Sequence, residues 1–310
     1  GTDTDNVDLG TLGGANSTAN AINDLGQIVG SSGAPSPAVG SRATLFRTTG
    51  NNVDLGGLGD DTTSRANDIN NLGQIVGEAE IQSNNTPATI VTRATLFSGT
   101  GTGNIDLGDS FLTGVPSSAA AINNVGQIVG YRENGSRRAA VFSPGGSITE
   151  LGTLPGGNFS QATAINDAGL IVGVGNALPP RLEYHGAIFQ GFNNNVDLGV
   201  LPEHSGTGAG RDGFSRASDV NNAGMIVGYS QLSGINIPTN GSGVIGTGSG
   251  WVRLPIDMEP AAINDWGQIV GTYRNRATLL NPVDPSDDDK RRSDQHQVRW
   301  RNGLWTLCRS

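Results

Sequence analysis

Tyrosine and arginine side chains recur just after a short apolar run, at places where they can bind a ligand. The run is Ile-Val-Gly, and three of its copies are followed by Tyr131 and Arg132, by Tyr229, and by Tyr273 and Arg274. An aromatic ring can stack on a sugar, and a guanidinium can bind a carboxylate through paired hydrogen bonds. We expect these side chains to emerge on one face of the fold as candidates for binding. The alternative interpretation is structural, with the same side chains covering sheet edges.

Candidates for acid–base catalysis are few and lie in one irregular insertion. Glu203, His204 and Asp212 fall within residues 202–214. A carboxylate near a histidine can transfer protons, as in propellers that cleave polysaccharides. A solvated surface loop is the alternative interpretation, and we favour it. We therefore predict no catalytic residue.

Composition argues against several other classes of protein. The chain of 310 residues has three histidines without a metal-ligand spacing and one cysteine, Cys308, without an evident base. We accordingly predict no metal and no cofactor. The formal net charge is −9 and Lys290 is the one lysine, which argues against a nucleic-acid partner. No stretch approaches the roughly 18 to 20 apolar residues of a membrane span.

Six copies of one motif organise the chain. Each copy reads Ile or Val, Asn, Asn or Asp, any residue, Gly, any residue, Ile-Val-Gly, and successive copies are 43 to 55 residues apart. Asn and Gly favour a tight turn between two short β-branched runs, so each copy predicts a hairpin. The Asn and turn Gly of the six copies are Asn23 and Gly26, Asn70 and Gly73, Asn123 and Gly126, Asn166 and Gly169, Asn221 and Gly224, and Asn264 and Gly267.

Two further elements follow each hairpin and complete a unit of four strands. The first resembles Arg-Ala-Thr-Leu-Phe at 42–46, and the second resembles Val-Asp-Leu-Gly at 53–56. Four strands in 40 to 50 residues suit a propeller blade better than the shorter coils of a solenoid. The sequence therefore predicts an all-β, six-bladed β-propeller of four-stranded antiparallel blades.

Opposite charges in the last two elements of each unit suggest cross-strand pairs. An arginine that opens one element is followed by an acidic residue in the next, and we interpret such pairs as structural. In the fourth unit a histidine replaces the arginine, and in the sixth the acid would come from the N-terminus. The pairs are Arg42 with Asp54, Arg93 with Asp106, Arg138 with Glu150, His185 with Asp197, and Arg276 with Asp8.

The propeller is expected over residues 1–281, with a charged linker and a C-terminal hairpin or tail over 282–310. The sixth unit lacks a Val-Asp-Leu-Gly element directly after Leu280. Either the N-terminal strand 6–10 or the hairpin at 298–307 can complete it. We favour the N-terminal strand, which would close the last blade and remove an open edge.

The six motifs and their partners resemble the HAF family of probable extracellular repeats, over nearly all of residues 6–280. The resemblance implies secretion or surface display and a propeller-like form, and it brings no reaction with it. We expect a non-catalytic binding or structural module, with self-association and an extracellular assembly as further expectations. The alternative is a carbohydrate-active enzyme, a polysaccharide lyase or hydrolase, with its site in the loops of repeats four and five.

Overall fold

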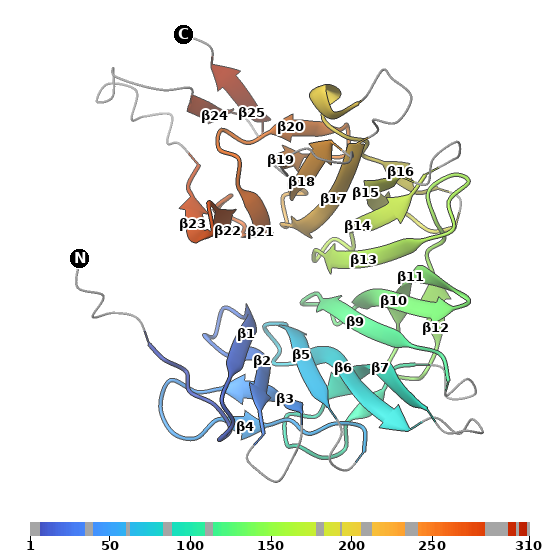
Figure 1. Ribbon diagram of the computed structural model, residues 1–310, viewed down its shortest axis with the longest axis vertical. Coiled ribbons are helices and arrows are strands. Elements are labelled where there is room, and N and C mark those ends of the chain that lie inside the picture. Colours follow the sequence, from blue (N-terminus) through green and yellow to red (C-terminus); the bar gives the residue numbers. More distant parts are fainter. Residues whose placement is uncertain are drawn as a thin grey trace. The chain divides into compact units, whose positions relative to one another are not determined.

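The computed structural model is an all-β chain of consecutive antiparallel sheets (Figure 1). The structure describes residues 7–34, 40–59, 63–82, 89–108, 114–177, 183–192, 194–205, 213–232 and 241–282, and the strands at 297–301 and 304–308. Within these ranges, the one helical element is the 3-10 turn η1 (Pro202–His204). A search of the same residues finds no apolar helix of membrane-spanning length.

Blades one to three each contain four strands. Blade one consists of β1 (Ser17–Ile22), β2 (Ile28–Gly33), β3 (Ser41–Phe46) and β4 (Val53–Asp54). Blade two consists of β5 (Ser64–Ile69), β6 (Ile75–Gln82), β7 (Ile90–Phe97) and β8 (Ile105–Asp106). Blade three consists of β9 (Ser117–Ile122), β10 (Ile128–Asn134), β11 (Ser136–Phe142) and β12 (Ile148–Glu150).

Blades four to six and a separate hairpin complete the chain. Blade four consists of β13 (Ser160–Ile165), β14 (Ile171–Asn176), β15 (Tyr184–Phe189) and β16 (Val196–Asp197). Blade five consists of β17 (Gly213–Val220), β18 (Ile226–Leu232), β19 (Ser242–Gly246) and β20 (Trp251–Arg253). Blade six consists of β21 (Glu259–Ile263), β22 (Ile269–Tyr273) and β23 (Arg276–Leu280), and the hairpin consists of β24 (Gln297–Arg301) and β25 (Leu304–Cys308).

Each blade is a meander whose neighbouring strands are also neighbours in the sequence. Blades one to five have four strands in this order, and blade six has three within the described residues. The hairpin of β24 and β25 forms a two-stranded sheet of its own. The predicted fold class, an all-β six-bladed β-propeller, is confirmed. The described residues of blade six form a sheet of β21, β22 and β23, without the expected fourth strand.

The chain comprises two compact units. Unit 1 comprises Gly1–Gly152 and Asn158–Gly169, which hold blades one to three and β13. Unit 2 comprises Thr153–Gly157 and Leu170–Ser310, which hold the other strands. All contacts given below join residues of the same unit.

The hydrophobic core lies between consecutive blades rather than inside one sheet. In unit 1, Val29 and Leu55 of blade one pack with Ile69 and Phe97 of blade two. A second cluster joins blades two and three, and in unit 2 a third cluster joins blades five and six. Small and β-branched residues therefore suffice for the core, because each blade buries one face on the next.

The glycine of each Ile-Val-Gly run allows two strands to approach closely. The register of β5 against β6 shifts between Ala66 and Asp68, opposite Gly77. A Cβ on Gly77 would lie 2.0 Å from the carbonyl oxygen of Arg65. The same crowding occurs at Gly30, Gly130, Gly228 and Gly271. The register shift brings the two strands too close for a Cβ, so glycine is required wherever this shift recurs in the blades.

In blades one, two, three and five, the asparagine of the hairpin turn also binds the turn of the next blade. In unit 1, side-chain Nδ2 of Asn23 donates to the carbonyl oxygen of Asn70, and that of Asn70 to Asn123, both at 3.0 Å. Asn123 donates likewise to Asn166, and in unit 2 Asn221 donates to Asn264. The turn glycines adopt positive φ, as the loop of such a hairpin requires. We call this series of bonds the turn ladder.

A serine at the start of a blade forms a second connection to the preceding one. The N–H of Ala43 donates to Ser64 Oγ at 2.9 Å, and Ser64 Oγ donates to the carbonyl oxygen of Gly56 at 2.5 Å. Ser160 makes equivalent bonds to Ala139 and Gly152. Because these serines are buried, their hydroxyl groups satisfy backbone groups that water does not reach.

The N-terminal segment 7–10 contacts blade one in the way that the end of one blade contacts the next. Ser17 Oγ donates to the carbonyl oxygen of Gly10 at 2.7 Å, and Asn52 Nδ2 donates to that of Leu9 at 2.8 Å. The segment does not form a strand in the described residues. Residue 6 lies outside them, and completion of blade six by this segment stays a prediction.

The expected charge pairs of blades two and four form, whereas the glutamate of blade three pairs with a different arginine. Arg93 contacts Asp106 at 3.1 Å. His185 Nδ1 lies 2.9 Å from Asp197. In blade three the expectation was wrong: Glu150 pairs with Arg132 at 3.0 Å, whereas Arg138 donates to the carbonyl oxygens of Arg137 and Asn158. Arg132 is the register partner of Arg138, so two cations compete for one carboxylate.

Candidate functional site

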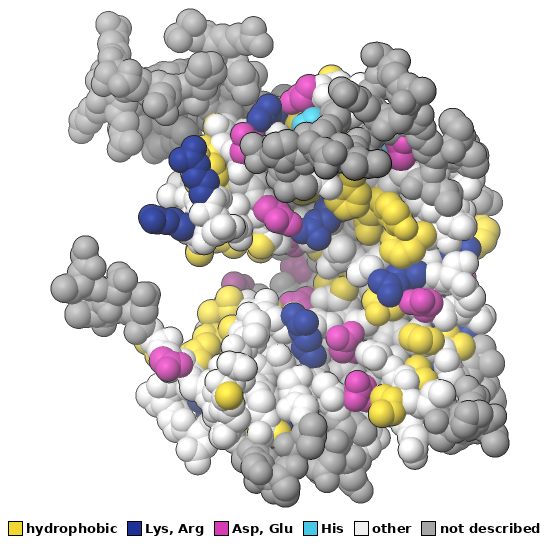
Figure 2. All heavy atoms as spheres, viewed as in Figure 1, with side chains coloured by type: hydrophobic (Ala, Val, Ile, Leu, Met, Phe, Trp, Pro, Cys, Tyr) yellow, Lys and Arg dark blue, Asp and Glu magenta, His cyan; other side chains and the backbone are white. Residues whose placement is uncertain are grey.

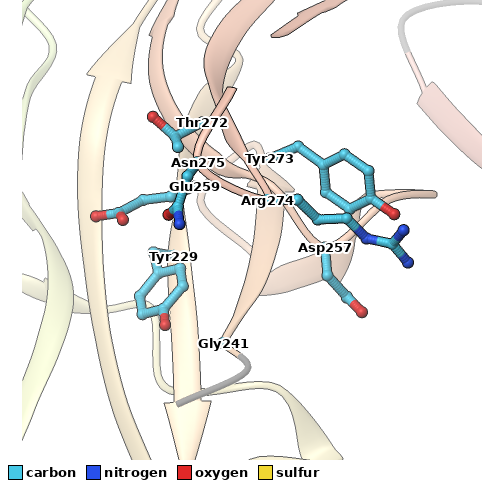
Figure 3. A pocket seen from close by; sticks show the side chains of 8 residues that line it. All are labelled: Tyr229, Gly241, Asp257, Glu259, Thr272, Tyr273, Arg274 and Asn275. Carbon is cyan, nitrogen blue, oxygen red and sulfur yellow. The ribbon is translucent and has the colours of Figure 1, made fainter. Parts of the chain in front are cut away.

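A cavity of about 350 Å³ in unit 2 brings three of the predicted binding residues together. Its lining comprises Tyr229, Gly241, Asp257, Glu259 and residues 272–275. Figure 3 shows Tyr229 and Glu259 on one side of the view, with Tyr273 and Arg274 on the other. Blade five supplies Tyr229 from β18, and blade six supplies the turn that follows β22.

Tyr229 is held in place by close backbone packing and by a hydrogen bond. Its hydroxyl donates to Gln231 Oε1 at 3.1 Å. A Cβ on Gly241 would lie 1.8 Å from the Tyr229 ring, so only a glycine fits there. Burial, followed by the negative charge of Glu259, raises the pKa of the Tyr229 hydroxyl. The ring therefore stays neutral and fixed at the cavity wall.

The turn that presents Tyr273 and Arg274 has an unusual backbone. Tyr273 pairs with Arg276, leaving Arg274 and Asn275 as a two-residue loop. Both have positive φ, 49° and 62° respectively. Such a loop favours Asn-Gly, and arginine in this region costs on the order of 1 kcal/mol or more. The Arg274 guanidinium lies 5.0 Å from the centre of the Tyr273 ring, in a cation–π contact.

The two carboxylates of the cavity are each bound to an arginine outside its lining. Glu259 pairs with Arg216 at 2.5 Å, and Asp257 pairs with Arg253 at 2.6 Å. Arg253 also reaches Glu203 at 3.6 Å. A carboxylate in an ion pair keeps lone pairs that accept further hydrogen bonds. Both groups can therefore accept bonds from ligand hydroxyls.

Tyr131 and Arg132 lie in unit 1 and do not line this cavity. The Tyr131 ring is covered by the Arg137 guanidinium, 3.9 Å from the ring centre. Arg137 pairs with Glu133 at 3.0 Å, and Arg132 pairs with Glu150. Burial raises the pKa of the Tyr131 hydroxyl. Tyr131 and Arg132 thus each contact side chains of unit 1.

The residues proposed for acid–base chemistry have separate partners. His204 Nδ1 lies 2.9 Å from Ser230 Oγ, and burial lowers the pKa of this histidine. Glu203 contacts Arg253, as above, and Asp212 lies outside the described residues. Burial thus favours the neutral imidazole.

Sequence reasoning missed Asp257, Glu259, Thr272, Asn275 and Gly241. The two carboxylates precede or begin β21, where no repeated pattern distinguishes them. The sequence could have placed Asn275 in a turn, because the segment Tyr-Arg-Asn-Arg between two apolar runs is short enough for a two-residue hairpin loop. Gly241 had no signal, because its role depends on Tyr229, which lies on the neighbouring strand β18.

The surface has mixed charge. Figure 2 shows basic and acidic side chains interspersed on the face in view, without a continuous basic area among the described residues. Within those residues, no group of three or more His, Cys, Asp or Glu side chains is arranged to hold a metal ion. Comparison with models of known protein families finds no match for the chain, and comparison with curated proteins finds none either.

Proposed function

We propose that this protein is a secreted or surface-displayed, non-catalytic β-propeller whose cavity in unit 2 binds carbohydrate. The observation that carries the proposal is the lining itself. Two tyrosines, Tyr229 and Tyr273, stand beside carboxylate, amide, hydroxyl and guanidinium groups. Stacking on a ring combined with many hydrogen bonds is the chemistry that recognises a sugar.

The location and lack of catalysis have separate support. The resemblance of the repeats to extracellular HAF repeats supports secretion or surface display. Asp257 and Glu259 are each held in an ion pair with an arginine, whereas the general acid of a glycosidase must deliver a proton to the leaving group. These points favour a binding module, within an extracellular assembly, over a polysaccharide lyase or hydrolase.

A glycan array and pull-down on insoluble polysaccharides test the binding. Tyr273→Ala should weaken binding by about fivefold, because stacking contributes about 1 kcal/mol. Tyr184→Ala is the matched control, since Tyr184 lies in unit 2 on β15 and does not line the cavity. Equal affinity of the Tyr273→Ala variant and the unchanged protein would reject the site.

A product assay tests the non-catalytic part of the proposal. Polysaccharides that bind are incubated with the protein, and reducing ends and unsaturated products are measured. We expect neither to rise above the level without protein. Release that persists after further purification of the protein would establish the enzyme alternative instead.

A further inference from the structure

We propose that the cavity selects acidic sugars, with Arg274 binding the carboxylate of a uronic acid residue. This inference rests on the proposed function and specifies its ligand class. The remaining lining groups would bind ring hydroxyls, and the tyrosines would contact the ring faces. Arg274 would thus determine specificity rather than contribute one hydrogen bond among several.

The turn at residue 274 does not itself favour arginine, because the backbone there is strained for any residue but glycine or asparagine. This indicates that the residue is arginine because of what its side chain binds. The hairpin between β10 and β11 in blade three turns at Gly135, and its φ of 74° costs nothing for glycine. Blade six has a similarly short turn with Arg274 in the left-handed region instead. Backbone strain of this kind clusters at ligand-binding sites.

Charge balance in the cavity also favours an anionic ligand group at Arg274. The two lining carboxylates already have arginine partners, Arg216 and Arg253. Arg274 has a ring contact with Tyr273 and no ion pair within the described part of the chain. Its guanidinium is exposed, so a carboxylate can approach it from solvent.

The shape of the guanidinium favours a planar anion. Arginine presents parallel N–H donors that match the two oxygens of a carboxylate. A uronic acid carries that carboxylate on the sugar ring, and Thr272 and Asn275 of the same lining can bind ring hydroxyls. The ring contact with Tyr273 restrains the Arg274 side chain, which reduces the entropy lost on binding.

The test compares a polyuronate with the same polymer after its carboxyl groups are reduced to alcohols. Binding of polygalacturonate oligomers and of their reduced forms is measured by isothermal titration calorimetry at low salt. We expect the uronate to bind at least tenfold more tightly. Arg274→Asn should abolish this difference, because asparagine tolerates the turn but lacks the positive charge.

A matched variant controls for the change in net charge. Arg47→Asn alters an exposed arginine of unit 1 and should leave the preference for uronate unchanged. Equal affinity of the unchanged protein for uronate and reduced oligomers would overturn the inference while leaving carbohydrate binding intact. Equally tight binding of a sulfated neutral oligomer would also overturn it, because the site would then recognise any negative charge rather than a carboxylate specifically. A lack of binding to every sugar would reject the proposed function itself.

Discussion

Asn70 donates its side-chain Nδ2 to the backbone carbonyl of Asn123 at 3.0 Å and so joins the turns of blades two and three. The same side chain accepts the N–H of Gln74 through Oδ1 at 2.9 Å. One buried amide thus closes its own hairpin and connects it to the neighbouring one. The asparagine that recurs in the motif therefore has two roles.

The turn ladder predicts a large loss of stability on removing one amide. Asn70→Ala leaves the buried carbonyl of Asn123 without its partner and removes the bonds within the turn. We expect the free energy of unfolding to fall by about 3 kcal/mol, measured by chemical denaturation. Leu72→Ser, at a side chain 71% exposed in the same turn, should change it by less than about 0.5 kcal/mol. Similar losses in both variants would contradict this role.

The buried charge pair of blade two predicts an asymmetric response to neutralisation. Arg93 is fully buried, and Asp106→Asn removes the negative charge of the carboxylate that it contacts. We expect a loss of about 3 kcal/mol in thermal or chemical unfolding. Asp197→Asn changes the equivalent residue of blade four, whose partner His185 can be neutral, so its loss at pH 8 should be much smaller. Equal losses would show that burial of the cation is not the cause.

Asp219 predicts that stability depends on pH in a mildly acidic range. Burial raises its pKa from 3.8 to about 6, although the N–H groups of Ile263 and Val220 oppose the shift. Because the folded state holds this proton more tightly than the unfolded chain, the stabilising contribution of Asp219 is complete below pH 4 and is lost as the pH rises from 4 to 6. A shift of this size corresponds to about 3 kcal/mol.

Asp219→Asn provides the check on that pH dependence. The variant cannot titrate, so its free energy of unfolding between pH 4 and 6.5 should lack this fall. The comparison uses denaturant unfolding of both proteins at each pH. An unchanged slope in the variant would assign the pH dependence to other carboxylates.

The packing of Gly241 against Tyr229 predicts a loss of binding without loss of fold. A methyl group at residue 241 would clash with the Tyr229 ring and displace it from the cavity wall. We expect Gly241→Ala to weaken carbohydrate binding about tenfold while the circular dichroism spectrum is retained. Gly145→Ala is the control, since nothing lies within 4 Å of a Cβ there. Full binding by Gly241→Ala would exclude Tyr229 from the site.

The sequence reveals the blades because hairpin chemistry is local. Asn, Gly and the β-branched residues of each motif predict the first two strands without knowledge of distant contacts. The partners of Ser64 lie in the preceding blade, and that of Asn70 lies in the next blade, 53 residues away. The motif itself gives no sign of either contact. The exchange at Glu150 was unpredictable for a similar reason, because Arg132 and Arg138 compete through strand register.

The candidate site could be predicted only in part. Tyr229, Tyr273 and Arg274 were recognised from their place after the repeated apolar run, and the structure places them around one cavity. The same rule selected Tyr131 and Arg132, which bind side chains of unit 1. Position in the repeat therefore identifies where a side chain emerges, but the neighbouring loops decide whether a cavity forms beside it.

The turn ladder has a consequence for how such a chain can evolve. Each step joins the side-chain amide of one motif's asparagine to the backbone carbonyl of the next motif's asparagine. The bond therefore does not depend on how many motifs precede or follow it. Duplicating one unit adds one more step without creating an unmatched group between neighbours. The ladder therefore makes the repeats interchangeable, and the number of blades must be set by the angle at which successive sheets pack.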